Sequence, residues 1–187
     1  MVQVPPKPLT LEAFLKLPET KPASEYIDRE MIQKPIPQGK HSLLQRELSF
    51  VLTANFRSER TAQVFPELRC TFGGRSIVPD IAVFRASRIP RDRNGDVANA
   101  FNLAPDWTIE ILSPNPSQTK VIRNVLHCLN NGTEMGWLLD PEESCIFIYR
   151  EDPSVQVFEG AEVVLPVPEF AGEVRLTAGE IFDWLKA

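Results

Sequence analysis

The stretch "SIVPDIAVFR", residues 76–85, joins a short apolar run to a carboxylate, Asp80, that directly follows a proline. The run is long enough for a buried strand, and a charge at its start is costly unless it is paired, hydrogen-bonded or bound to a metal. The same combination recurs in "DWTIEILSP", residues 106–114, where Glu110 stands between isoleucines. Two carboxylates within apolar strands of one chain indicate a functional site.

Strand geometry predicts how these carboxylates are placed. Side chains alternate between the two faces of a strand, so Glu110 shares a face with Thr108 and Leu112. If the strands of Asp80 and Glu110 are neighbours, their carboxylates converge at one end of the sheet. Two adjacent carboxylates repel each other unless a cation lies between them. Oxygen ligands of this kind suit Mg²⁺ or Mn²⁺, which can activate a water and polarise a phosphoryl group.

The remaining sequence predicts alternating helices and strands around these two stretches. Helices are expected from Thr10 to Pro18, at about 40–57, at about 117–130, and from Thr177, which is in capping-box register with Glu180. Strands are expected at 25–34, 62–71, 77–85 and 107–112, and in "MGWLLD", "SCIFIYR" and "VQVFEG". This order predicts an α/β domain around one central sheet, and the length predicts a single domain over residues 1–187.

Composition is that of a globular protein, with 43% hydrophobic and 24% charged residues. No apolar run approaches the roughly 20 residues of a membrane span, so no membrane association is expected. The N-terminal stretch lacks the basic and apolar regions of a signal peptide. The three cysteines, Cys70, Cys128 and Cys145, form no CxxC spacing. They are expected to be reduced thiols, which predicts a cytoplasmic protein.

Charge is unevenly distributed along the chain. The net charge of −5 argues against a protein that coats nucleic acid, because phosphate contacts require Lys and Arg. Basic residues nevertheless outnumber acidic ones up to residue 130, and arginines are concentrated between Arg57 and Arg93. Two interpretations remain open for that segment: a basic face that contacts phosphates, or a solvated loop that is rich in arginine.

Several motifs together resemble a known family. "PD" on one strand and "EIL" on the next resemble the PD-(D/E)XK restriction-endonuclease-like superfamily. In order, "EYIDREMIQKPIPQGKH", "VPDIAVF", "APDWTIEILSP" and "GWLLDP" are similar to the Uma-two family of endonucleases, from about residue 10 to the end. The resemblance implies a restriction-endonuclease-like fold, with a central mixed β-sheet flanked by helices. It also implies that Asp80 and Glu110 bind a metal ion, with the backbone carbonyl of Ile111 as a third ligand.

The chain departs from the superfamily pattern at the catalytic lysine. That lysine is expected two residues after the second acid, where this chain has Leu112. Its alternative place on the following helix is occupied by Asn124. Lys120 lies one turn earlier on the same helical face and is the predicted substitute, with Arg123 as the alternative if the register differs by one.

Two further residues match the family upstream. Glu30 matches an acid on the first strand and is expected to be an additional catalytic or metal-facing group. His41 precedes the first long helix and has two possible roles, contacting phosphate or capping the helix.

Three functional hypotheses follow. The first is a Mg²⁺- or Mn²⁺-dependent DNA endonuclease, in which Asp80 and Glu110 hold the ion, Lys120 orients the water and the arginine-rich segment contacts phosphates. The second is a catalytically inactive nuclease-like fold that acts as a nucleic-acid or protein-binding module, favoured by Leu112 and Asn124. The third is a hydrolase of small phosphoesters. The resemblance also implies a possible homodimer, formed through the acidic C-terminal third.

Overall fold

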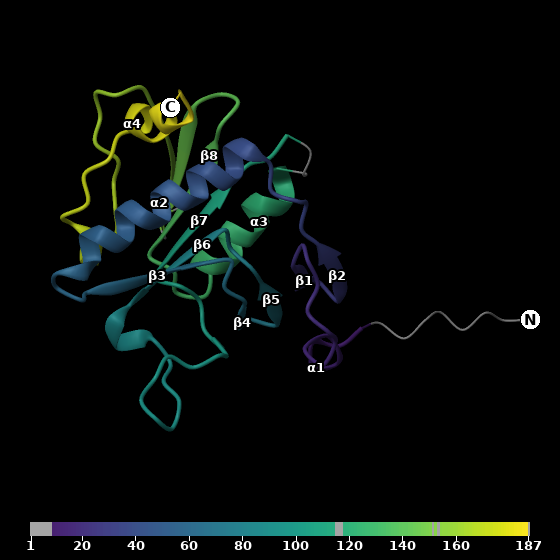
Figure 1. The fold of residues 1–187 in the computed structure, drawn as a ribbon. Helices are drawn as coiled ribbons and strands as arrows, with labels where there is room; N and C mark the ends of the chain where they lie inside the picture. The colour runs from purple at the N-terminus through teal and green to yellow at the C-terminus, as the bar shows by residue number, and fades with distance from the viewer. Residues whose placement is uncertain (1–8, 115–117, 151, 153, 187) are drawn as a thin grey trace, which may run out of the picture.

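The computed structural model describes residues 9–114, 118–150, 152 and 154–186 (Figure 1). Its larger sheet has six strands in the order β10-β9-β8-β7-β6-β3. The pair β7–β8 is parallel and the other neighbours are antiparallel, which confirms a mixed sheet. The strands are β3 (Ala62–Pro66), β6 (Ile81–Arg85), β7 (Trp107–Ile111), β8 (Met135–Asp140), β9 (Cys145–Arg150) and β10 (Val155–Glu159).

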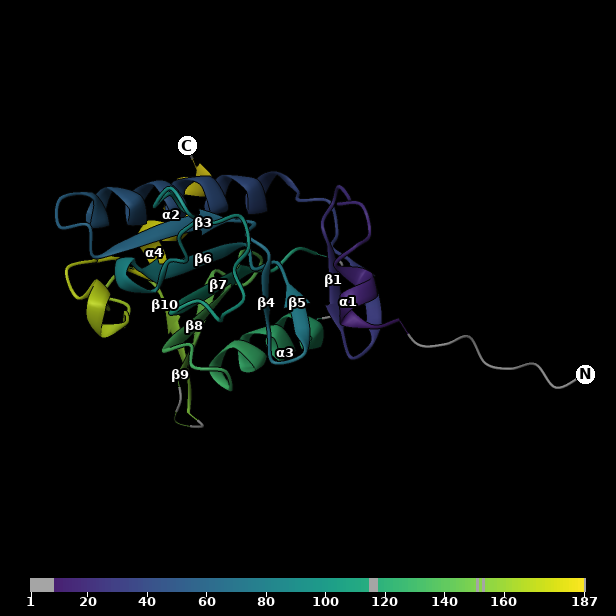
Figure 2. The same cartoon turned by 90° about the horizontal axis from the view of Figure 1, so that it is seen from below.

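Helices cover both faces of this sheet, with α2 (Gly39–Arg57) and α3 (Gln118–Leu129) on opposite sides (Figure 2). The alternation predicted for β7 explains the arrangement. Trp107 and Ile109 pack in the same cluster as the α2 residue Leu48, whereas Leu112 packs with Val125 of α3. The C-terminal helix α4 (Ala178–Asp183) contributes to the cluster on the α2 side. The fold is therefore the predicted α/β layer structure.

A second sheet has four short strands in the order β2-β1-β5-β4. They are β1 (Ser24–Ile27), β2 (Glu30–Gln33), β4 (Cys70–Phe72) and β5 (Arg75–Ile77). This sheet corrects three strand predictions. The segment 25–34 is a hairpin, because Asp28 and Arg29 turn the chain with φ of 52° and 71°. The segments 62–71 and 77–85 each divide between the two sheets, because β3 and β6 belong to one and β4 and β5 to the other.

The helix starts predicted at Thr10, near residue 40 and at Thr177 are confirmed, but the first helix ends at Phe14, before the predicted stop at Pro18, and the C-terminal helix changes to a 3₁₀ turn after Asp183. Thr10 caps α1 (Leu11–Phe14) by accepting the Ala13 N–H at 3.1 Å, and Thr177 forms a capping box with Glu180 on α4. After α3, Gly132 has φ of 95°, as expected of a residue that ends a helix in the left-handed region. Residue 117, the predicted start of α3, lies outside the described residues. Three 3₁₀ turns complete the structure: η1 (Ala86–Arg88), η2 (Glu169–Ala171) and η3 (Trp184–Lys186).

All three cysteines are buried free thiols, as predicted. Burial raises the pKa of the Cys70 thiol to about 12, so that thiol stays protonated near neutral pH. Within the part of the chain that the structure describes, no helix has both the length and the apolar character needed to cross a bilayer.

Candidate active site

Strand pairing brings Asp80 and Glu110 together, as their predicted positions on neighbouring strands require. β6 and β7 are antiparallel with Ile81 opposite Ile109, so the residue before β6 lies opposite Glu110. Both carboxylates are almost fully buried, at 3% and 4% exposed. The backbone N–H of Ile111 donates to Asp80 Oδ2 at 2.8 Å. This bond holds the Asp80 carboxylate against the end of β7, the strand that carries Glu110.

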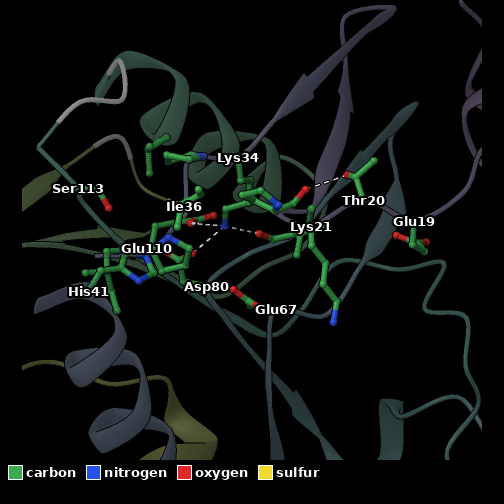
Figure 3. A pocket seen from close by; sticks show the side chains of 17 residues that line it. Glu19, Thr20, Lys21, Lys34, Ile36, His41, Glu67, Asp80, Glu110 and Ser113 are labelled. Atoms are coloured by element: carbon green, nitrogen blue, oxygen red, sulfur yellow. Dashed lines mark hydrogen bonds and ion pairs between the residues drawn. The ribbon is translucent and has the colours of Figure 1, made fainter. Parts of the chain in front are cut away.

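A lysine that the sequence analysis did not select lies between the two carboxylates (Figure 3). Lys34 follows β2 directly, and its Nζ lies 2.7 Å from Asp80 Oδ1 and 3.9 Å from Glu110 Oε2. The same ammonium donates to the Val78 carbonyl at 2.7 Å. The side chain is 20% exposed. One positive charge is thus shared by two buried acids.

His41 binds Asp80, a contact that differs from both of its predicted roles. Its Nε2 lies 3.0 Å from Asp80 Oδ2, and the ring is buried in the first turn of α2. The N-cap of α2 is Gln38, so His41 is not the residue that caps the helix, and the phosphate contact stays a prediction. One turn later, Gln45 donates to the Asp80 carbonyl at 2.8 Å. The positive end of the α2 dipole therefore lies beside the Asp80 carboxylate.

A third buried carboxylate, Glu25, completes the cluster from β1. Its Oε1 accepts the Val78 N–H at 2.8 Å, and its Oε2 accepts from Asn124 Nδ2 at 3.2 Å. Asn124 is the α3 position at which the family resemblance implied a lysine. Here an uncharged amide meets Glu25, and its Oδ1 has no partner among the described residues. The cation of the cluster is supplied by Lys34 instead.

The pKa values of the cluster follow from its charges, because three buried carboxylates share a single lysine, Lys34. Burial raises the pKa of Glu110 well above its usual range, and the negative charges of Asp80 and Glu25 add to that effect although Lys34 opposes it. Burial alone would raise the pKa of Asp80 too, but Lys34 and His41 hold it well below its usual range. Burial would lower the pKa of Lys34, yet the surrounding carboxylates raise it. Asp80 and Lys34 therefore form the ion pair, and Glu110 is left undercompensated.

The cluster forms part of the wall of a cavity of about 650 Å³. Asp80, Glu110 and Ile111 line it together with Lys34 and His41. The segments 19–23 and 35–37 line it as well, and Figure 3 shows Lys21 and Ile36 from these two segments around the acids. The acids are thus accessible to a ligand through this cavity.

Three residues selected from the sequence are not brought into the cluster. Lys120 is exposed in the first turn of α3, Arg123 is exposed on the same helix, and Glu30 is exposed where β2 begins. None of them lines the cavity. Lys120 lies one turn before Asn124, the α3 residue that meets Glu25, and its side chain is exposed. The catalytic roles expected for Lys120 and Glu30 therefore have no support from their positions.

Sequence signals existed for the residues that were missed. Glu25 is a carboxylate within "SEYI", a stretch that is buried throughout, as β7 is. Lys34 ends the same hairpin directly before Pro35, where the chain leaves the sheet. Reading the segment 25–34 as one strand placed these two residues far apart, whereas the hairpin brings both ends to the site.

The arginine-rich segment does not form a free basic face at the cavity. Four of its arginines bind carboxylates within the chain: Arg69 with Glu19, Arg75 with Asp28, Arg85 with Glu134 and Asp106, and Arg88 with Asp106. These four arginines are therefore engaged in ion pairs within the chain, and the expectation that this segment supplies the phosphate contacts stays a prediction.

The donor set fits a hard divalent cation in its chemistry. It consists of the carboxylate oxygens of Asp80 and Glu110 and the carbonyl of Ile111, and oxygen-only sets of this kind are those that Mg²⁺ prefers. Glu110 is the undercompensated acid, so additional positive charge would relieve it. Among the described residues, however, no group of three or more His, Cys, Asp or Glu side chains is arranged to hold an ion. Lys34 supplies part of the compensation instead.

The fold and the paired acids define the class as a restriction-endonuclease-like protein. Residues 11–179 match the family Uma2, described as "Putative restriction endonuclease", and the chain belongs to this family.

Five chains of solved structures match the protein. One is a crystal structure from Anabaena variabilis, described as "a putative nuclease belonging to DUF820". It is 57% identical with a TM-score of 0.93, and the alignment covers 95% of this chain and 99% of the other. No curated protein gave a significant match.

Proposed function

We propose that the protein is a Mg²⁺- or Mn²⁺-dependent endonuclease that hydrolyses phosphodiester bonds in DNA. The observation that carries the proposal is the buried pair Asp80 and Glu110, bridged by Lys34 inside a cavity of about 650 Å³. Membership in a restriction endonuclease family and the similarity to a nuclease structure support the same reaction.

The cluster provides a distinct role for each side chain. Asp80 and Glu110, with the Ile111 carbonyl, would hold the divalent ion, which when bound polarises the phosphoryl group and activates a water. Lys34 takes the role first assigned to Lys120: its ammonium steadies the negative charge that develops on the phosphate. His41 and the Ile111 N–H hold Asp80 in place, each through Oδ2. Glu25 and Asn124 support the neighbouring backbone at Val78.

A catalytically inactive, binding-only fold is the second candidate. The observation that favours it is the position of Lys34, whose ammonium already lies between the acids, together with the lack of a three-residue ligand cluster in the described part of the chain. In such a protein, Lys34 would take over the charge compensation that a metal ion supplies in an enzyme.

A plasmid-nicking assay with and without Mn²⁺ separates the two candidates. The native protein is compared with Asp80→Ala, Lys34→Met and Lys120→Ala. The endonuclease proposal expects metal-dependent nicking that is lost in the first two variants and retained in Lys120→Ala, because Lys120 is exposed outside the cavity. A folded native protein that nicks no form of DNA with either ion would favour the binding-only fold.

Pairing of two copies and a cytoplasmic location stay predictions. The edge strand β10 offers an exposed surface for pairing, with Val155 and Val157 at 49% and 52% exposed. Light scattering during size-exclusion chromatography measures the mass: twice the chain mass of 21.1 kDa would support the homodimer, and the chain mass itself would contradict it.

A further inference from the structure

The buried position of the acids limits how a phosphodiester reaches them. The side chains of Asp80 and Glu110 are only 4% and 5% exposed, and they contribute to the wall of the cavity. A scissile phosphate must therefore enter the cavity with the nucleotide that carries it. The phosphates of a duplex lie on its outer surface, so a paired nucleotide would have to leave the helix to follow its phosphate into the cavity, whereas an unpaired strand enters without that step. A cavity of about 650 Å³ is in the range that holds one small ligand.

The walls above the acids are apolar. Pro22, Pro35 and Pro37 line them, with Val121 on the α3 side. Ile36 stands between two of these prolines and is 73% exposed, so its side chain is available to a ligand (Figure 3). Apolar surfaces contact the faces of unstacked bases, which stacking in a paired duplex keeps covered.

Positive charge around the cavity is scarce. Among its described lining residues, Lys21 and Lys34 are the lysines or arginines, whereas Glu19, Glu67, Asp80 and Glu110 are acidic. Binding the backbone of a duplex depends on several phosphate contacts from Lys and Arg. Arg57 lies at the far end of α2 from His41, and a helix of that length separates its ends by roughly 25 Å. The described lining of the cavity therefore does not offer the basic track that a duplex requires.

We propose that the cavity accepts an unpaired strand of DNA, such as a single strand or a frayed end, in preference to a base-paired duplex. This inference rests on the proposed nuclease function and specifies its substrate. The apolar walls contact the exposed bases, and Lys34 binds the phosphate beside Asp80 and Glu110.

Binding and cleavage are measured separately with one fluorescent oligonucleotide, free or annealed to its complement. Fluorescence anisotropy without divalent ions reports binding, and gel analysis with Mn²⁺ reports cleavage. The single strand is expected to bind at least about tenfold more tightly than the duplex and to be cleaved faster. Ile36→Asp is expected to weaken single-strand binding by about tenfold. The matched control is Phe50→Asp, at a residue that is 69% exposed on α2 and does not line the cavity.

The outcomes distinguish this inference from the proposed function. A duplex that is bound and cleaved as well as the single strand overturns the inference and leaves the nuclease intact. A single strand that is bound preferentially but never cleaved supports the substrate preference and overturns the nuclease. Absence of both binding and cleavage overturns both. If Ile36→Asp and Phe50→Asp weaken single-strand binding equally, the strand does not bind in the cavity.

Discussion

Asp80 and Asp106 occupy equivalent positions on neighbouring strands. Each follows a proline, precedes a strand and is 3% exposed. Each accepts a backbone N–H from the last residue of the other's strand at 2.8 Å: Ile111 donates to Asp80, and Arg85 donates to Asp106. Because β6 and β7 are antiparallel, the two aspartates lie at opposite ends of the sheet.

The two aspartates differ in the charge around them. Arg88 donates to Asp106 at 2.7 Å and the Arg85 guanidinium lies 3.8 Å away, so one acid has two cationic neighbours. Asp80 instead shares Lys34 with Glu110 inside a cavity. A buried acid after a proline therefore does not by itself mark a site. The proposed site rests on a further difference: Asp80 shares its cation with a second buried acid beside a cavity.

The largest difference is expected in catalysis. Asp80→Asn should lower the nicking rate by about a thousandfold, the upper range for loss of one preorganised catalytic group. Asp106→Asn should leave the rate per folded molecule within about threefold, because Asp106 lies at the other end of the sheet. Nicking rates normalised to the folded fraction, measured by circular dichroism, test this. Similar losses in both variants would mean that the two aspartates are not functionally distinct.

Removing the cationic side chain beside each aspartate should also distinguish the two ends of the sheet. Lys34→Met leaves buried acids without their shared partner and should cost about 3–5 kcal/mol of unfolding free energy at pH 8. The acids then bind protons more readily when folded than when unfolded, so the variant's stability falls as the pH rises from 5 to 8. Arg88→Met should cost about 1 kcal/mol, because that side chain is 34% exposed and Asp106 keeps the Arg85 N–H.

Urea denaturation at both pH values in EDTA measures these costs. A loss in Lys34→Met that is the same at pH 5 and pH 8 would contradict the charge imbalance inferred for the cluster.

Glu110→Gln is expected to stabilise the protein. The folded pKa of Glu110 is raised by burial, so its contribution to stability declines as the pH rises from its usual 4.5 through the raised folded value. Glutamine removes that penalty, which we expect to raise the unfolding free energy at pH 8 by about 2 kcal/mol and Tm by roughly 4–8 °C. The gain should vanish near pH 4, where the native carboxyl is protonated in both states.

The matched control for Glu110→Gln is Glu134→Gln. Glu134 binds Arg85 and accepts the Glu169 N–H, so its charge is compensated and the substitution should leave Tm unchanged or lower. Thermal denaturation in EDTA compares the two variants. A lower Tm for Glu110→Gln at pH 8 would show that Glu110 stabilises the fold and is not undercompensated.

The smallest expected effect is that of the metal itself. Mg²⁺ at several times its Kd should stabilise the native protein by about 1 kcal/mol, or roughly 2–4 °C in Tm. Asp80→Asn should abolish this gain, and Asp106→Asn should retain it, because only Asp80 belongs to the proposed ligand set. A Tm that does not respond to Mg²⁺ or Mn²⁺ would support the binding-only fold.

Local sequence patterns were sufficient for much of the fold. The helical spacing of Leu44, Leu48 and Leu52 predicted α2 within one residue of its observed start, and Thr177 with Glu180 predicted the start of α4. These predictions succeeded because periodicity and capping depend on residues a few positions apart. The prediction of 25–34 as a single strand failed because the left-handed turn falls at Asp28 and Arg29, where no glycine marks it and arginine rarely adopts that conformation.

The sequence by itself determined that buried acids precede or occupy two strands, and it predicted that Asp80 and Glu110 lie together if those strands are neighbours, which the pairing of β6 with β7 confirms. The motif is local, and the alternation of side chains fixes which face each acid takes. Only the tertiary structure decided which cation meets them. Lys34 lies 46 positions from Asp80 and reaches it because the β1–β2 hairpin packs beside β5. Charge compensation depends on distance in space, so spacing along the chain cannot distinguish the acid at the cavity, Asp80, from its paired counterpart, Asp106.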